Sequence, residues 1–311
     1  MLIEFHRAML ADRVRNAAFH EALRRVIVPD VTTVADIGCG TGLLAFMASR
    51  LGARAVHCYE QGPVIALAER LARANRVRNL VFYPEHSTAI LDPEPVDVVV
   101  SETLGNYAYE ENIVETLRDA RRFLKPGGTL IPQHLAQWVA PVASDRFHRE
   151  LGAWDDVGFG LDFGLAKAMS LNNLYVRSVA PEDLLWGIAY ARQWDAVALG
   201  ARAASLRRGE ARWQADAMGT VHGFALWWRC ELVPGVTLAT GPADPATHWE
   251  QLYLPTLEPI ALARGDELAL HIRSDSRAEG VRIRWQITHR RAADGSAQTQ
   301  NLDMRKGDLG G

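Results

Sequence analysis

A glycine-rich segment near the start of the chain has the residue types and spacing to hold a nucleotide-like cofactor. It reads VADIGCGTGLL and places Gly38, Gly40 and Gly42 between an expected strand and an expected helix. Glycines at such a junction let the backbone turn tightly and approach a ligand closely. A dinucleotide site favours G-x-G-x-x-G, whose third glycine would fall at Leu43, so the observed spacing favours a methyl donor. With Asp36 just ahead of the glycines, the segment predicts a site for S-adenosylmethionine (SAM).

Polar side chains also follow the next two expected strands. Glu60 follows residues 55–59, where a carboxylate can accept both hydroxyls of an adenosine ribose. Glu85 and His86 follow residues 80–83 and could meet the adenine. The alternative for Glu60 is a solvated glutamate at the end of a strand, and the alternative for Glu85 and His86 is ordinary loop polarity.

Two glutamates nine residues apart could act on a cationic acceptor. Glu102 follows the expected strand 96–100, and Glu111 begins the next helix with Glu110 beside it. Two carboxylates can clamp a guanidinium, which is planar, always charged and carries five donors. They can offset its repulsion from a sulfonium, about 4 kcal/mol at ~4 Å and an effective dielectric of ~20, and one can accept the proton lost on methylation. Glu110 by itself is explained by the helix dipole.

The elements that position these residues have an α/β pattern. Short apolar runs alternate with helical ones up to residue 131, which predicts a doubly wound, Rossmann-like SAM-binding domain over 1–131. All nine tryptophans follow Pro132, and period-two alternation predicts an antiparallel β-barrel or sandwich over 132–291. A helical stretch at about 164–194 is either a dimerisation arm or a core-packing insertion.

Predictions for the two ends of the chain depend on periodicity and composition. Apolar residues recur at intervals of three and four over 1–27, which indicates one amphipathic helix. Residues 292–311 are rich in Gly, Ser, Gln and Asp, which predicts a mobile tail. No apolar run approaches the ~18 residues that a membrane span needs, so we expect an uncleaved soluble protein and no membrane partner.

These motifs together resemble the protein arginine methyltransferase family. SETLGNYAYEE is similar to that family's double-glutamate loop, with Glu102 and Glu111 at its spacing; a loop one residue shorter would select Glu110. THWEQ, at 247–251, matches the THW loop, which in the family lies in the barrel domain and closes over the substrate arginine. The resemblance runs from about Phe5 to His289 and includes an arm where the family dimerises.

The first helix carries further roles that the resemblance implies. His6, Met9, Asp12 and Arg15 follow one another at intervals of three. The resemblance implies that Arg15 holds the methionine carboxylate of the cofactor and that Asp12 pairs with His248. It also places Met9 and Trp249 on the substrate side. Without the resemblance, this stripe would be a polar solvated helix face.

The sequence departs from the family pattern in two respects. The family's N-terminal lid helix, with its tyrosine pair, would fall before Met1. Leu104 and Ala108 resemble the branch that dimethylates symmetrically, whereas Met9 and the intact THW resemble the asymmetric branch. The type of methylated product therefore does not follow from the sequence.

Composition sets limits on the partners. A net charge of −3 and a pI near 6.4 give no basic field that would gather nucleic acid, so we expect no nucleic-acid partner. Cys39, Cys58 and Cys230 lie far apart and the histidines lack ligand spacing, which predicts no metal site and a reducing cytoplasm. We expect a homodimeric enzyme acting on arginine in a protein or peptide. The alternatives are a methyltransferase for free arginine or a small guanidine, and a non-catalytic SAM-binding scaffold.

Overall fold

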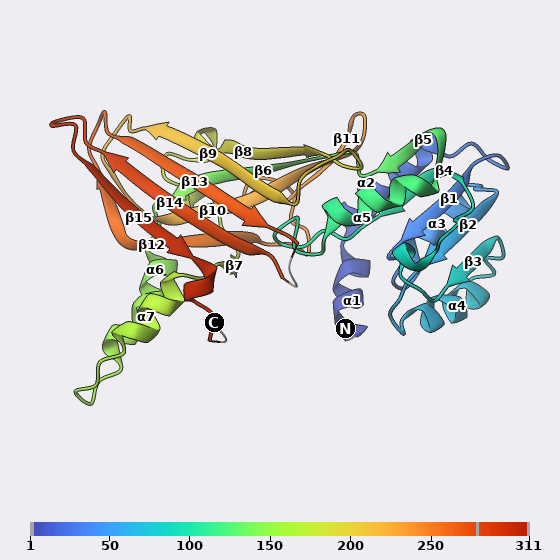
Figure 1. The fold of residues 1–311 in the computed structure, drawn as a ribbon, viewed down its shortest axis with the longest axis horizontal. Helices are drawn as coiled ribbons and strands as arrows, with labels where there is room; N and C mark the ends of the chain where they lie inside the picture. Colours follow the sequence, from blue (N-terminus) through green and yellow to red (C-terminus); the bar gives the residue numbers. More distant parts are fainter. Residues whose placement is uncertain (1–2, 278–279, 310–311) are drawn as a thin grey trace.

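The computed structural model describes residues 3–277 and 280–309, which form two halves side by side along the longest axis of the molecule (Figure 1). The first half is a parallel sheet with helices, and the second is built from antiparallel strands. β5 (Leu124–Ile131) is the last strand of the first half and β6 (His134–Val142) begins the second. Short helix α1 lies between the halves (Figure 1).

The first half confirms the predicted doubly wound sheet. Its strand order is β3-β2-β1-β4-β5, and each strand pairs with its neighbours in parallel. The remaining strands are β1 (Thr33–Ile37), β2 (Ala55–Tyr59), β3 (Leu80–Tyr83) and β4 (Val96–Ser101). Helices α3 (Leu43–Arg50), α4 (Ile65–Ala74) and α5 (Ile113–Ala120) connect them. Because β1 and β4 are neighbours at the point where the strand order reverses, their carboxyl ends form the ligand-binding edge of the sheet.

The prediction of one N-terminal helix is wrong. The chain forms α1 (Ile3–Ala11) and α2 (Arg13–Val26), separated by Asp12; Met1 and Leu2 lie outside the described residues. Asp12 has an extended conformation and caps α2, its Oδ1 accepting from the Arg15 N–H at 2.9 Å. A capping aspartate satisfies a backbone donor that the first turn leaves free, so it favours a helix start at this point.

The second half has the predicted antiparallel character. One sheet has the order β7-β12-β10-β6-β8, with β11 on β10, and the other has the order β15-β14-β13-β9. The long central strand β10 (Gly219–Val233) pairs with β6 and with β12 (Gln251–Leu262). The other strands are β7 (Tyr175–Arg177), β8 (Arg192–Ala198), β9 (Leu206–Gln214), β11 (Val236–Ala239), β13 (Glu267–Asp275), β14 (Arg282–Arg290) and β15 (Ala297–Asp303).

Two predicted segments of this half need correction. The helical projection consists of α6 (Arg146–Leu151) and α7 (Gly164–Leu171), so it begins before residue 164, and the chain returns to the sheet at β7 and β8 (Figure 1). The tail is also not free. β15 pairs with β14 along its whole length and buries Leu302, although Gly310 and Gly311 lie outside the described residues. Polar composition hid this strand because Leu302 is the single buried apolar side chain among its seven residues.

The two halves share one hydrophobic core. Phe19 of α2, Tyr109 of the segment after β4 and Trp228 of β10 are all fully buried members of it. Arg25 of α2 also donates to the carbonyl of Pro234 at 2.9 Å. Such continuous packing holds the active-site edge of the first sheet against the second half. Among the described residues, no helix is long and apolar enough to cross a membrane.

Candidate active site

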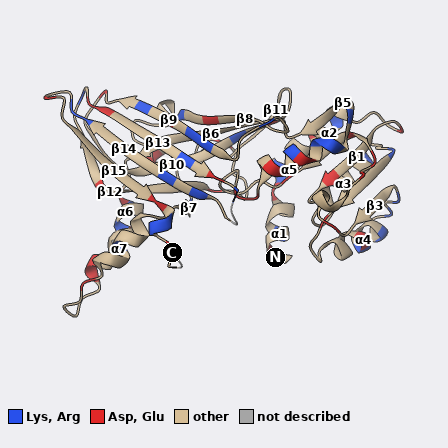
Figure 2. Ribbon diagram, in the orientation of Figure 1, with Lys and Arg blue, Asp and Glu red and all other residues tan. Residues whose placement is uncertain are grey.

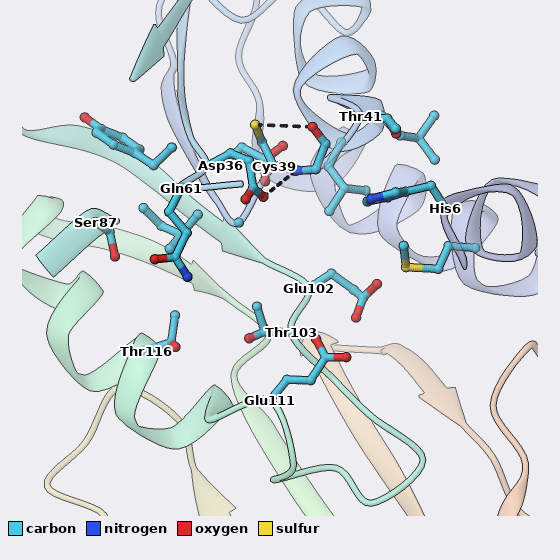
Figure 3. A pocket seen from close by; sticks show the side chains of 18 of the residues that line it. His6, Asp36, Cys39, Thr41, Gln61, Ser87, Glu102, Thr103, Glu111 and Thr116 are labelled. Atoms are coloured by element: carbon cyan, nitrogen blue, oxygen red, sulfur yellow. Dashed lines mark hydrogen bonds between the residues drawn. The ribbon is translucent and has the colours of Figure 1, made fainter. Parts of the chain in front are cut away.

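A cavity of about 390 Å³ opens at the carboxyl edge of the parallel sheet (Figure 3). Its size lies within the range of small-molecule and cofactor sites. Its walls come from α1, from the glycine loop between β1 and α3, and from the segments that follow β2, β3 and β4. Most of the predicted site residues line it: Met9, Arg15, Asp36, Gly38, Gly40, Glu60, Glu85, His86, Glu102 and Glu111.

The glycine loop has the backbone conformation that its sequence predicts. Gly38, Gly40 and Gly42 all have positive φ angles, of 75°, 53° and 88°. Only glycine adopts this conformation at no steric cost. Gly42 is not among the residues that line the cavity; it begins α3 and packs close to the Phe46 ring.

Glu60, which directly follows β2, binds the backbone of the glycine loop. Its two carboxylate oxygens accept from the Gly40 N–H at 3.1 Å and the Gly62 N–H at 2.7 Å. The Glu60 side chain also lines the cavity. This position suits a ligand that carries vicinal hydroxyls.

Asp36 lies at the floor of the cavity and is almost fully buried. Its Oδ2 accepts from the Ala45 N–H at 3.0 Å, whereas Oδ1 has no hydrogen-bond partner among the described residues. Burial raises the pKa of this carboxyl to about 7, and the nearby Arg15 only partly opposes it. An unsatisfied buried acceptor is costly, so Oδ1 is a position where a ligand donor or cation would be favourable.

Glu102 extends from the end of β4 and is held on both of its oxygens. Oε2 accepts from Nε of Arg15 at 2.7 Å and also from the same guanidinium's terminal nitrogen, and Oε1 accepts from the Leu104 N–H at 3.1 Å. Both side chains are nearly buried, at 7% and 4% exposed. Two charge-assisted hydrogen bonds to one buried oxygen, together with the backbone bond to the other, orient the carboxylate strongly. Arg15 therefore contacts both Glu102 and the cavity, whereas the resemblance implied only a cofactor contact.

Glu111, rather than Glu110, faces Glu102. Figure 3 shows the carboxylates of Glu102 and Glu111 turned toward the same space. Burial of the Glu111 carboxyl, and then the like charges of Glu102 and Glu110, raise its pKa to about 7. The residue as a whole remains exposed to solvent.

Glu110 instead folds back over its own loop. Its Oε1 accepts from the Asn106 N–H at 2.9 Å, and a Cβ on Gly105 would lie 2.0 Å from that oxygen. Glycine at 105 is thus what allows this arrangement. The geometry supports the register in which Glu102 pairs with Glu111.

The pair that the resemblance implied between Asp12 and His248 is present. Asp12 Oδ2 accepts from the His248 backbone N–H and contacts its Nδ1, each at 2.8 Å. Burial would raise the pKa of Asp12, but hydrogen bonds from Arg15 and His248 outweigh it and lower the pKa below its ordinary value. Neither side chain lines the cavity; the pair braces the α1–α2 junction against the THW loop.

Trp249 does not lie where a substrate contact was predicted. It is 5% exposed and absent from the cavity wall; its indole N–H donates to the Leu104 carbonyl at 2.8 Å. Its ring packs edge-on against Trp228, with centroids 5.0 Å apart. Burial of a large aromatic next to another explains the difference, and Trp249 supports the glutamate loop instead.

The cavity wall contains both predicted polar residues and others to which the sequence assigned no role. Glu85 and His86 are exposed at its rim, while the cavity wall also contains His6, Gln61, Ser87 and Thr116 (Figure 3). His6 packs on the glycine loop, since a Cβ on Gly40 would lie 3.3 Å from its ring. Burial lowers the pKa of His6, which favours its neutral form. The only feature of the sequence that pointed to His6 was its spacing of three residues from Met9 in the first helix.

The sequence matches two family models and several named relatives. Residues 34–128 match a methyltransferase domain, and residues 135–290, just over half of the chain, match the arginine methyltransferase oligomerization subdomain. Protein arginine N-methyltransferase 6 of Xenopus tropicalis is 30% identical over 280 residues, covering 86% of this chain and 82% of the relative. Probable protein arginine N-methyltransferase 6.1 of Oryza sativa subsp. japonica is 28% identical, covering 83% and 75%.

Solved structures show the same fold. The Trypanosoma brucei PRMT1 enzyme-prozyme heterotetrameric complex with AdoHcy aligns with a TM-score of 0.86 at 22% identity, over 98% of this chain and 99% of that one. Arabidopsis thaliana protein arginine methyltransferase 10 aligns with a TM-score of 0.80 at 22% identity, over 97% and 98%. With the matched oligomerization subdomain and the 30% identical relative, these findings confirm the resemblance. The chain belongs to the protein arginine N-methyltransferase family.

Proposed function

We propose that this chain transfers the methyl group of SAM to a guanidino nitrogen of arginine in a protein or peptide. The observation that carries the proposal is the pair of carboxylates, Glu102 and Glu111, facing one space beside a glycine loop of the methyltransferase type. Family membership supports the same activity. A SAM-binding scaffold would have no need for two facing carboxylates.

The residues of the cavity fit the cofactor. The positive-φ glycines allow close approach, and Glu60 presents a carboxylate where ribose hydroxyls can donate. Arg15 uses three of its five donors on Glu102 and Asn16, so two remain for a carboxylate. When bound, SAM supplies an electrophilic methyl on a sulfonium.

The two glutamates prepare the acceptor. Their negative charges attract a guanidinium, and their acceptor oxygens can orient its planar fork so that one nitrogen points toward the cofactor side. Glu102 is fixed by Arg15 and serves best as the rigid orienting partner. The pKa of Glu111 is raised to about 7, and its carboxylate has no hydrogen bond to any of the described residues. It therefore suits the acceptance of the proton released from the methylated nitrogen.

His248 and Asp12 support this site from the second half. Their hydrogen bonds tie the THW loop to the first turn of α2, which also carries Arg15. The role assigned to them is therefore to hold the acceptor side closed. Met9 lines the cavity beside Arg15 and would contact the substrate.

The oligomeric state is a homodimer built through the projecting arm. Exposed apolar side chains gather at its far end, namely Phe159 at 95%, Leu165 at 87% and Leu161 at 61% exposed. Apolar side chains so exposed on a projection favour burial against a partner. The matched oligomerization subdomain supports this. A monomeric mass by light scattering at micromolar concentration would contradict it.

The compartment is a reducing cytoplasm. Cys39, Cys58 and Cys230 are all buried and unpaired, as is usual where thiols stay reduced.

The test of function uses purified protein with labelled SAM. Arg/Gly-rich peptides, free arginine and agmatine are offered separately, and mass spectrometry identifies the methylated nitrogen. Transfer to peptide arginine is the expected result. Turnover of small guanidines alone would contradict the polypeptide substrate, and SAM binding without transfer to any acceptor would identify a scaffold.

A further inference from the structure

The loop that carries the two glutamates leaves the first half of the molecule but is held by the second. Four of its residues each bond to a group from the second half. Trp249 donates to the Leu104 carbonyl at 2.8 Å and Trp228 to the Gly105 carbonyl at 2.9 Å. In addition, the Glu250 N–H donates to Asn106 Oδ1 at 2.8 Å.

The fourth contact is a buried ionic one. The Tyr109 hydroxyl donates to Asp195 Oδ2 of β8 at 2.8 Å. The same oxygen accepts from Nε of Arg207 on β9 at 2.8 Å, and Oδ1 accepts from the guanidinium's terminal nitrogen at 2.5 Å. Tyr109 is fully buried, and the Asp195 and Arg207 side chains are 6% and 16% exposed. Removal of any one of these three side chains would leave buried polar atoms of the other two without a hydrogen-bond partner, which is energetically costly.

We propose that Asp195, held by Arg207 and acting through Tyr109, is a positioning residue for the Glu111 carboxylate. This inference rests on the proposed function of Glu111. Tyr109 lies two residues before Glu111, and α5 begins at Ile113, so the chain between the two anchors is short. Asn112 has a left-handed conformation, with φ 58°, which reduces the slack further. The place of Glu111 opposite Glu102 is therefore set by contacts from β8 and β9.

The consequence is that losing the Tyr109 hydroxyl moves Glu111 away from Glu102. A closely packed loop has few alternative conformations. Loss of the Tyr109–Asp195 hydrogen bond should therefore move the loop to a different position rather than only increase its mobility. Misplacement of a catalytic group lowers turnover without requiring loss of cofactor binding. It also weakens the repulsion from Glu102 that helps to raise the pKa of Glu111.

The experiment compares Tyr109→Phe, Asp195→Ala and Asp195→Asn with wild type in the full chain. Each is measured for kcat, KM for peptide, SAM affinity, thermal stability and the titration of Glu111 by carboxyl carbon NMR, with Glu111→Gln assigning the signal. Tyr109→Phe should lower kcat about tenfold, leave SAM affinity unchanged and lower the pKa of Glu111. Asp195→Asn retains an acceptor oxygen for Tyr109 and should recover part of the activity that Asp195→Ala loses.

Two matched variants separate positioning from general stability. Tyr190→Phe removes another tyrosine hydroxyl bound to an aspartate, Asp216, and Asp266→Ala removes a buried aspartate paired with His289 at 2.8 Å. Both should leave kcat and the Glu111 titration at wild-type values.

An unchanged kcat and Glu111 titration in Tyr109→Phe would overturn the inference, as would equal losses in the matched variants. If Asp195→Ala does not fold, Tyr109→Phe decides, because it removes one oxygen atom. Absence of methyl transfer in wild type would refute the proposed function. The NMR titration would still report whether Tyr109 positions Glu111.

Discussion

The two sides of the cavity are built in different ways. The cofactor side is local: Asp36, the glycine loop and Glu60 lie within one strand–helix–strand unit and bond mainly to one another's backbone. The acceptor side brings together Asp12, the loop from Glu102 to Glu111, and His248, which is 236 residues from Asp12.

This difference determines how each side responds to change. A local cradle is preorganised by backbone conformation and depends on few distant contacts. The acceptor side depends on the packing of the two halves, because its carboxylates belong to the first half and are held by hydrogen bonds from the second. Figure 2 shows that both halves carry acidic and basic residues. Substitutions should therefore separate cofactor affinity from turnover.

The largest effect is expected for Glu102→Gln. The amide keeps the shape but loses the charge that orients the guanidinium, so turnover should fall by ~10² or more. SAM affinity, measured by calorimetry, should stay nearly unchanged because the cofactor contacts are local. The matched variant is Glu110→Gln, which keeps an acceptor for the Asn106 N–H and should retain most activity. Wild-type turnover in Glu102→Gln would remove this carboxylate from the acceptor site.

The second effect concerns pH. Because the pKa of Glu111 is raised to about 7, its carboxylate is lost as the pH falls below 7, and kcat/KM should decrease about tenfold per unit there. The bound sulfonium and guanidinium favour the ionised form of Glu111 and lower its pKa in the substrate complex. The pH profile of kcat, which reports on that complex, should therefore lie at lower pH than the profile of kcat/KM. Rate measurements between pH 5.5 and 9 test this. A flat kcat/KM profile between pH 6 and 8 would show that the ionisation of Glu111 does not limit catalysis.

Glu60→Gln should affect the cofactor side of the cavity. One amide oxygen cannot accept from both Gly40 and Gly62 and from a ribose, so SAM affinity should fall about tenfold. At saturating SAM, kcat should remain within a few-fold of wild type. Glu69→Gln on α4, whose partly exposed side chain does not line the cavity, is the matched control with little expected effect. A loss of kcat as large as that of Glu102→Gln would mean that the two sides are not separable.

The smallest effect is expected for Asp12→Ala. Loss of the α2 cap should lower the free energy of unfolding by about 1 kcal/mol, with an additional loss from unpaired His248. Urea denaturation measures it. Asp145→Ala is the matched control, because Asp145 precedes α6 without any capping hydrogen bond from its side chain. Equal destabilisation by the two variants would contradict a specific role for the Asp12 cap.

Local signals predicted much of the fold. The strands of the parallel sheet, the glycine loop and Glu60 follow from short-range patterns, because backbone conformation and alternation act over a few residues. The break between α1 and α2 was missed, since a helical period continues through Asp12. That aspartate acts as a cap while its second oxygen binds His248, a contact that no local pattern contains.

By itself, the sequence determined the class of cofactor, the two carboxylates and the THW segment, because these depend on residue type and spacing. Only the tertiary structure decided between Glu110 and Glu111, through the close approach of Glu110 to Gly105. It likewise moved Trp249 from the substrate to the support of the glutamate loop. Glu110 folds back onto the backbone of its own loop, a contact that residue spacing does not encode. Trp249 reaches the Leu104 carbonyl across 145 residues of sequence, and that contact exists because the two halves share a core.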